Sequence, residues 1–84
     1  MWYFGESKYI KVTVDESTVA SGLITIYNSA ETEVISDAVI TVSGSLLSYL
    51  WQPGATGIYV AVFSYVSGNE RFEERKVVEV WETL

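Results

Sequence analysis

Residues 49–68 decide the fold of this chain, and they read YLWQPGATGIYVAVFSYVSG. The stretch contains Pro53, the chain's one proline, and three of its six glycines. Proline removes a backbone donor and glycine permits a positive φ, so segment 53–57 predicts a corner at which a strand must stop. Residues 58–67 then have strand composition without a break. The stretch predicts two strands joined by a corner.

The flanking sequence shows the alternation of half-buried strands. Segment 8–15 places Ile10, Val12 and Val14 on one face and polar or aromatic residues on the other. Strands are also expected over 22–28, 32–35, 38–43, 46–52 and 71–82, with turns at 28–31, 36–37, 43–45 and 68–69. Short strands at this spacing predict an all-β fold, an antiparallel β-sandwich of six to seven strands, with a barrel as the alternative.

Length and composition indicate a single domain over 1–84, in which residues 1–7 form an aromatic N-terminal tail. A chain of 84 residues has a small core, and the absence of cysteine rules out disulfide support. The net charge is −6, and Lys8 and Lys11 are the only bases before position 71, so we expect no nucleic acid partner. The longest apolar run, 58–63, is too short to cross a bilayer, and no signal peptide is recognisable, so we expect no membrane insertion.

The sequence lacks the residues that most catalytic sites use. It contains no histidine and no cysteine, so an enzyme would depend on carboxylates. The acidic candidates are Asp15/Glu16, Glu31/Glu33, Asp37 and Glu73/Glu74, and no spacing places two of them across a cleft. We therefore expect no catalytic residues, no cofactor and no small-molecule substrate.

Two binding alternatives remain open at this level. Loops carrying Asp15, Glu16 and Asp37 could hold calcium, but no EF-hand spacing is present, and a plain acidic rim is the better interpretation. Exposed rings of Trp51, Trp81 or Tyr65 could stack on a sugar. Core or interface packing is the better interpretation of these aromatic residues, and we expect no metal ligands.

The segment 58–67 also indicates association, because both of its faces are apolar. The outer face of a small sandwich is normally wet, so we expect either a neighbouring subunit or the aromatic tail to cover one of them. The charged segment 71–76 suits an exposed edge. The predicted interface consists of Trp2, Tyr3, Phe4, Ile58, Val60, Val62 and Trp81.

A family resemblance follows from YLWQP at 49–53, TGIYVA at 56–61, the Gly68-Asn69 turn and VVEV at 77–80. These motifs, which span residues 40–80, resemble the small immunoglobulin-like modules of tailed-virus structural proteins. They are also similar to prealbumin-like domains and to bacterial immunoglobulin-like domains of surface proteins. Two features depart from the pattern: Ala55 stands where a tyrosine corner has aspartate, and the disulfide with its packed tryptophan is missing.

The resemblance implies an immunoglobulin-like sandwich and a non-catalytic role. In the virus case the chain is a virion component that decorates the capsid or joins neck or tail parts, with virion proteins or further copies of itself as partners. A chain that starts at Met1 without an export signal or anchor favours this setting. The alternative is a module of a cell-surface or adhesin protein, located at the cell surface.

Overall fold

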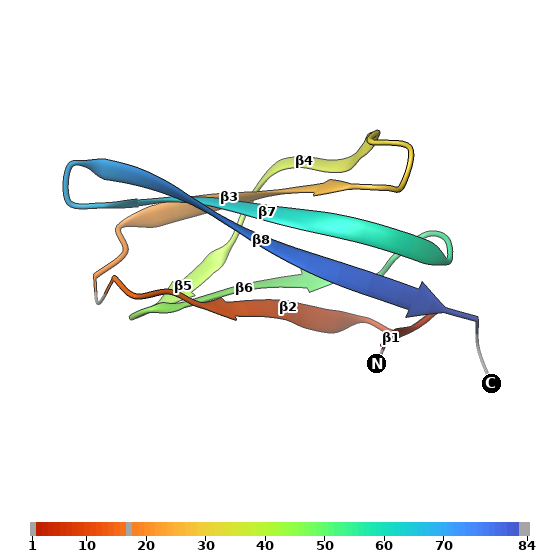
Figure 1. Cartoon of the computed structure of the whole chain (residues 1–84). Coiled ribbons are helices and arrows are strands. Elements are labelled where there is room, and N and C mark those ends of the chain that lie inside the picture. Colours follow the sequence, from red (N-terminus) through yellow and green to blue (C-terminus); the bar gives the residue numbers. More distant parts are fainter. Residues whose placement is uncertain (1, 17, 83–84) are drawn as a thin grey trace.

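Two β-sheets face one another in the computed structural model, which describes residues 2–16 and 18–82 (Figure 1). The strands of the described residues are β1 (Trp2–Tyr3), β2 (Lys8–Thr13), β3 (Ser21–Tyr27), β4 (Glu33–Val39), β5 (Thr41–Ser43), β6 (Leu46–Trp51), β7 (Gly57–Ser67) and β8 (Glu70–Trp81). One sheet has five strands in the order β1-β8-β7-β3-β4, and the other has three in the order β2-β6-β5. The prediction of an all-β sandwich is confirmed, with eight strands in place of six or seven.

The strand order is that of an immunoglobulin-type sandwich, in which one sheet contains strands B, E and D and the other contains C, F and G. Taken in chain order from B, the strands β2 to β8 become B, C, C′, D, E, F and G. The two sheets then read B-E-D and G-F-C-C′, with β1 added beside G in parallel. All other strand pairs are antiparallel.

The predicted corner and hairpins lie where the turn residues indicated. The chain passes from β6 to β7 through the Pro53 corner, and Gly57 has the expected positive φ, at 136°. Gly44 and Gly68 also have positive φ, in the β5–β6 and β7–β8 hairpins. These glycines allow the tight turns that set the register of each pair.

The break expected at 36–37 is instead a bulge inside β4. The register with β3 shifts between Ile24 and Ile26, and Asp37 takes a left-handed φ of 48°. The Asp37 amide donates to Thr25 Oγ1 at 3.2 Å, and this hydroxyl donates to Asp37 Oδ1 at 3.4 Å. The Thr25 side chain thus replaces part of the backbone hydrogen bonding between β3 and β4, and β4 continues to Val39.

The strand expected over 38–43 divides at Ile40, where the chain leaves one sheet for the other. Ile40 is buried, and an added Cβ on Gly22 would lie only 2.6 Å from its Cδ1 atom. The absence of a side chain at position 22 therefore leaves room for this crossing segment to pack on β3.

The N-terminal segment, which the sequence indicated as an aromatic tail over residues 1–7, adds the short strand β1 to the sandwich. Trp2 and Tyr3 pair in parallel with Val80 and Trp81, and the Phe4 amide donates to the Trp81 carbonyl at 2.7 Å. The Glu6 carboxylate accepts a hydrogen bond of 2.7 Å from the Tyr3 amide, which lowers the pKa of Glu6. Met1, also assigned to the tail, lies outside the described residues.

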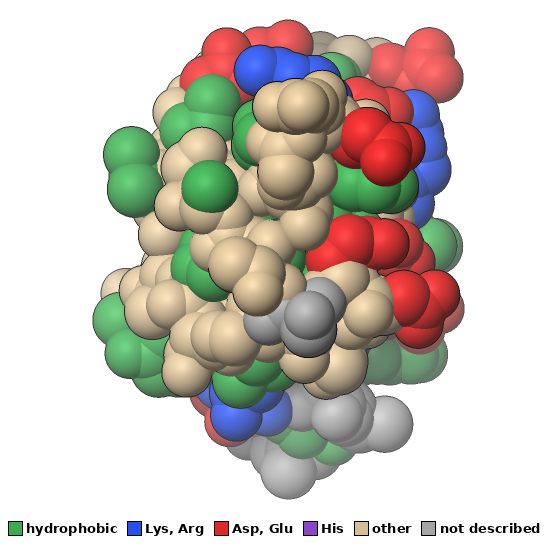
Figure 2. Space-filling model, turned by 90° about the vertical axis from the view of Figure 1, so that its left-hand side faces the viewer, with side chains coloured by type: hydrophobic (Ala, Val, Ile, Leu, Met, Phe, Trp, Pro, Cys, Tyr) green, Lys and Arg blue, Asp and Glu red, His purple; other side chains and the backbone are tan. Residues whose placement is uncertain are grey.

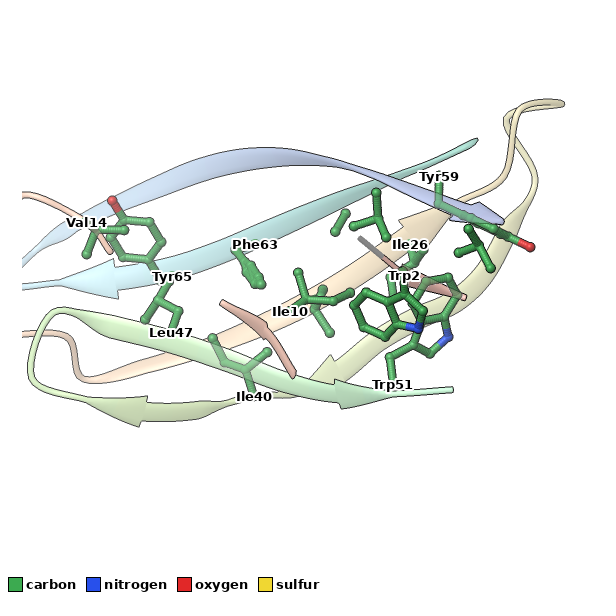
Figure 3. Packing of buried hydrophobic residues seen from close by; sticks show 14 of the residues in the cluster. Trp2, Ile10, Val14, Ile26, Ile40, Leu47, Trp51, Tyr59, Phe63 and Tyr65 are labelled. Carbon is green, nitrogen blue, oxygen red and sulfur yellow. The ribbon is translucent and has the colours of Figure 1, made fainter. Parts of the chain in front are cut away.

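The core lies between the two sheets, and aromatic rings fill one end of it (Figure 3). Trp51 makes edge contacts with Trp2 at 5.7 Å and with Tyr59 at 4.9 Å between ring centroids. Phe63 and Ile10 are fully buried further along the sandwich. Edge-to-face ring pairs add about 0.5–1.5 kcal/mol each beyond the apolar area that they bury.

Candidate functional site

The two apolar faces of β7 have different environments. The face with Tyr59, Ala61, Phe63 and Tyr65 is buried in the core. Side chains alternate along a strand, so Ile58 and the even-numbered residues after it point away from the core. The outer face of the five-stranded sheet therefore carries the apolar side of β7 that the core does not use.

Cross-strand pairs extend this surface onto β8. Ile58 lies opposite Glu79, and Val60 lies opposite Val77. The side chains of Ile58 and Val77 are 53% and 62% exposed. Trp81, two positions after Glu79 on the same face, is half exposed. We call Ile58, Val60, Val77 and Trp81 the terminal cluster, since they lie toward the end of β8.

A second apolar group lies at the opposite end of the same face. Leu23 pairs with Ser64 and Val39, and Val66 pairs with Arg71. Val39 is the most exposed large hydrophobic residue of the described chain, at 80%. We call Leu23, Val39 and Val66 the hollow cluster, because they line a surface hollow of about 430 Å³ together with Ile40, Ser64 and Arg71.

The charges on this face follow β8. Arg71, Glu73 and Arg75 point outward in its first half, and Glu79 does so in its second half. The Arg71 guanidinium donates to Ser64 Oγ at 3.4 Å, beside the hollow. Within residues 2–16 and 18–82 the one ion pair joins Lys8 and Glu6, so neither outward arginine has a carboxylate within 4.0 Å in that part of the chain.

Lys76 has a different role, because its position on β8 points toward the other sheet. It pairs with the buried Ala61, and its Nζ atom donates to the Lys11 carbonyl at 2.9 Å. This hydrogen bond joins β8 of the five-stranded sheet to β2 of the three-stranded sheet. Three of the five bases thus lie on β8, two facing out and one bridging the sheets.

The predicted interface residues divide between the core and the surface. Trp2 is only 8% exposed and belongs to the core, so its assignment to an interface is corrected. Val62 is also buried within the monomer, although it lies on the outward side of β7. Tyr3 and Val60 are half-buried, whereas Phe4, Ile58 and Trp81 are exposed.

Two exposed residues of the face, Val77 and Val39, were missed. Val78 and Val80 enter the core, as the sequence indicated, and the same alternation places Val77 outside. The sequence therefore contained the signal that places Val77 on the surface. Val39 lies between Ala38 and Ile40, which both pack toward the core, so the same alternation also places Val39 outside.

The other sheet carries a smaller exposed apolar group. Tyr9 and Leu50 face each other across β2 and β6 and are 52% and 51% exposed. Leu46, opposite Thr13, is the remaining large apolar residue on this side. Leu50 can therefore serve as a control for substitutions of Ile58 on the five-stranded sheet, since the two side chains have nearly equal exposure.

The acidic and aromatic alternatives have specific positions in the structure. Within the described ranges, no group of three or more acidic residues could hold a metal ion. Glu16 instead accepts a hydrogen bond of 2.6 Å from the Tyr65 hydroxyl. Trp51 and Tyr65 are buried, so they cannot form an exposed row of rings with Trp81. Core packing is therefore the role of the first two.

No protein-family model, curated protein or solved structure matches this chain. The likeness to immunoglobulin-type domains rests on strand order and local geometry. In the part of the chain that is described, no helix is long and apolar enough to cross a membrane.

Proposed function

We propose that this chain is a non-catalytic structural protein that binds other proteins through the outer face of its five-stranded sheet. The observation that carries the proposal is the terminal cluster, in which Ile58, Val77 and Trp81 are each at least half exposed on adjoining strands. Contiguous apolar surface rimmed by charge is typical of protein interaction sites. Covering half-exposed Ile58 and Val77 would contribute about 1 kcal/mol each.

The ends of the sandwich are less suited to apolar contacts. Figure 2 views the end that bears the β7–β8 turn, where polar side chains and backbone atoms cover most of the surface. The hydrophobic side chains visible there form no continuous patch. A sheet face is therefore a better candidate than the loops at this end.

The resemblance to modules of tailed-virus structural proteins suggests the setting of a virion, where the chain would decorate the capsid or join neck or tail parts. Such a component functions by binding other virion proteins, and it needs no catalytic residue. A module of a cell-surface protein is the alternative setting, and the strand order is compatible with both, because fold alone does not determine function.

Site-specific photo-crosslinking tests the proposed face. A photo-reactive residue at position 58 should link the chain to a protein neighbour in assembled particles. The same residue at position 50 is a matched control, since Leu50 is 51% exposed against 53% for Ile58. Equal crosslinking at both positions, or none at 58, would refute the assignment of the face.

The setting has its own test, which is independent of the face. The test uses purified particles of the tailed virus whose structural genes neighbour the gene for this chain. These particles should contain the chain in stoichiometric amounts. Its absence from such particles, or its location in a long open reading frame with repeated domains, would refute the virion role and favour the surface module.

A further inference from the structure

We propose that the open edge of β8 binds an extended strand of a different protein, which adds to the five-stranded sheet beside residues 71–77. The added strand would carry acidic side chains opposite Arg71 and Arg75 and a basic side chain opposite Glu73. This inference rests on the proposed function, because it specifies which element the protein partner contributes and how that element is recognised.

Most of β8 has a neighbouring strand on one side only. Strand β7 pairs with it over residues 70–80, whereas β1 lies on the other side at Val80 and Trp81 alone (Figure 1). Within residues 2–16 and 18–82, no other strand pairs with β8. The side of β8 that faces away from β7 is therefore open along residues 70–79, and we call it the β8 edge.

The direction of the backbone groups at this edge follows from a hydrogen bond at the end of β8. The Phe4 amide donates to the Trp81 carbonyl, so the backbone groups of Trp81 point away from β7. The N–H and C=O groups of successive residues alternate in direction along a strand, and the β7–β8 register contains no bulge. The odd-numbered residues of 71–77 therefore direct their N–H and C=O groups out of the sheet, where an added strand can pair with them.

Both sides of the β8 edge are accessible. The side chains of residues 73–77 are all exposed, including Glu74 and Lys76, which lie on the side of β8 that faces the three-stranded sheet. That sheet therefore does not cover this part of β8. Nearer the terminal cluster, a hollow of about 290 Å³ opens between β8 and β2, with Trp2, Ile10 and Val78 in its lining. The hollow leaves room for the inward side chains of an added strand.

The other edge of the five-stranded sheet has a different construction. Strand β4 contains the Asp37 bulge, and bulges are one of the devices by which proteins prevent unwanted strand addition. Strand β8 has a regular register with β7 and contains no proline. Its outward charges have both signs, with Glu73 between Arg71 and Arg75. Such a row disfavours strands of the wrong charge and leaves the edge open to a complementary strand.

The outward charges specify the chemistry of the partner strand. In the described part of the chain, neither Arg71 nor Arg75 has a carboxylate within 4.0 Å, so both can donate to acidic side chains of an added strand. Opposite charges on directly opposed residues stabilise neighbouring strands, whereas like charges destabilise them. The complementary series is acid, base, acid, and it reads the same in both directions. A parallel and an antiparallel partner strand therefore meet the same requirement.

A second copy of the chain meets this requirement poorly. Two-fold antiparallel pairing of β8 with itself sets one residue directly opposite the same residue of the other copy. Every residue from 73 to 76 is charged, so an axis in the middle of the edge sets like charges against each other. We therefore assign the added strand to a different protein.

Two synthetic peptides test the edge by nuclear magnetic resonance of the isotope-labelled chain. One peptide alternates threonine with the series Glu, Lys, Glu and Val, and the other has the inverted series Lys, Glu, Lys and Val. The first should slow the solvent exchange of the backbone amides at positions 73, 75 and 77 and leave the amides of β4 unchanged. The inverted peptide should bind roughly tenfold more weakly. The net charge of −6 favours the inverted peptide at long range, so this preference would report local pairing.

Proline substitution separates strand addition from folding. Glu73→Pro removes an amide that points out of the sheet, so it should abolish binding of the first peptide while the fold remains. Glu73→Ala keeps that amide and should weaken binding only severalfold. Arg75→Pro removes another outward amide and repeats the test where Glu73→Pro does not fold. Circular dichroism of each variant should match that of the wild type.

Several results would overturn the inference. They are equal binding of the two peptides, equal binding by Glu73→Pro and Glu73→Ala, and no effect of either peptide on the β8 amides at millimolar concentration. Slower exchange of these amides with rising concentration of the chain alone would identify a second copy as the occupant and overturn the assignment to a different protein.

The crosslinking experiment distinguishes failure of this inference from failure of the proposed function. Crosslinking through position 58 without peptide binding would overturn the added strand and leave the proposed function standing. Peptide binding at the β8 edge without a crosslink at position 58 would support the edge and refute the assignment of the face.

Discussion

The Tyr59 hydroxyl donates a hydrogen bond of 2.7 Å to the backbone carbonyl of Ala55, four residues earlier. It closes the corner between β6 and β7, the place at which immunoglobulin-type sandwiches have a tyrosine corner. The sequence lacks the aspartate expected near this corner. Because the acceptor is a backbone oxygen, the bond forms with alanine at position 55.

Removing this hydroxyl should destabilise the domain while preserving its fold. Tyr59→Phe loses one part-buried hydrogen bond and keeps the ring contact with Trp51, so we expect a loss of about 1–2 kcal/mol in the free energy of unfolding. Urea denaturation would measure it. Tyr49→Phe is a suitable control, since the half-buried Tyr49 makes no hydrogen bond through its hydroxyl among residues 2–16 and 18–82. Equal losses in both variants would contradict a specific role for the corner.

The strands and turns of the fold could be predicted because their signals are local. Each signal lies within a few residues of the structure that it determines. Examples are the alternation over 8–15, the glycines of the Gly44 and Gly68 hairpins, and the Pro53 corner. The place of the N-terminus could not be predicted in this way. Trp2 pairs with Val80 at the other end of the chain, and no local pattern encodes a parallel contact of that range.

The candidate face was predictable in part. Two apolar sides of β7 were visible in the sequence, but which of them enters the core depends on the whole sandwich. The buried side contains the larger rings, Phe63 and Tyr65, and the outer side is mostly β-branched. The Asp37 bulge changes the phase of β4 between Ile35 and Ala38, which both pack against the core. It is held by hydrogen bonds with Thr25 and has no distinctive pattern in the sequence.

Replacement of Trp2 should reveal that the N-terminal strand belongs to the core. Trp2→Ala removes a ring that packs on Trp51 and donates from Nε1 to the Glu6 carbonyl at 3.2 Å. We expect a loss of about 3 kcal/mol in the free energy of unfolding. Phe4→Ala is the control, because Phe4 is 39% exposed and should cost at most about 1 kcal/mol. A fully stable Trp2 variant would instead favour a tail that lies outside the core.

Two glycines of the corner allow backbone strain to be separated from steric contact. An added Cβ would meet nothing within 4 Å at either Gly54 or Gly57, but Gly57 has a φ of 136°. Gly57→Ala should therefore destabilise the domain by about 1–3 kcal/mol through strain alone. Gly54→Ala should be neutral or slightly stabilising, because it restricts the unfolded chain. Thermal denaturation of the two variants would measure the difference, and equal midpoints would exclude a strained φ at position 57.

Tyr65 predicts a loss of stability at alkaline pH. Burial of its ring and the hydrogen bond to Glu16 raise the pKa of Tyr65 from 10.0 to about 12. Between pH 10 and 12 the unfolded chain releases this proton while the folded chain retains it, so the contribution is complete below pH 10 and is lost as the pH rises toward 12. Tyr65→Phe should cost about 1 kcal/mol at neutral pH, and its stability should approach that of the wild type above pH 10. Urea midpoints measured across this range would detect the convergence, with Tyr9→Phe on the surface as the control. Wild-type and Tyr65→Phe curves that stay parallel up to pH 12 would show that the hydroxyl does not hold its proton in the folded state.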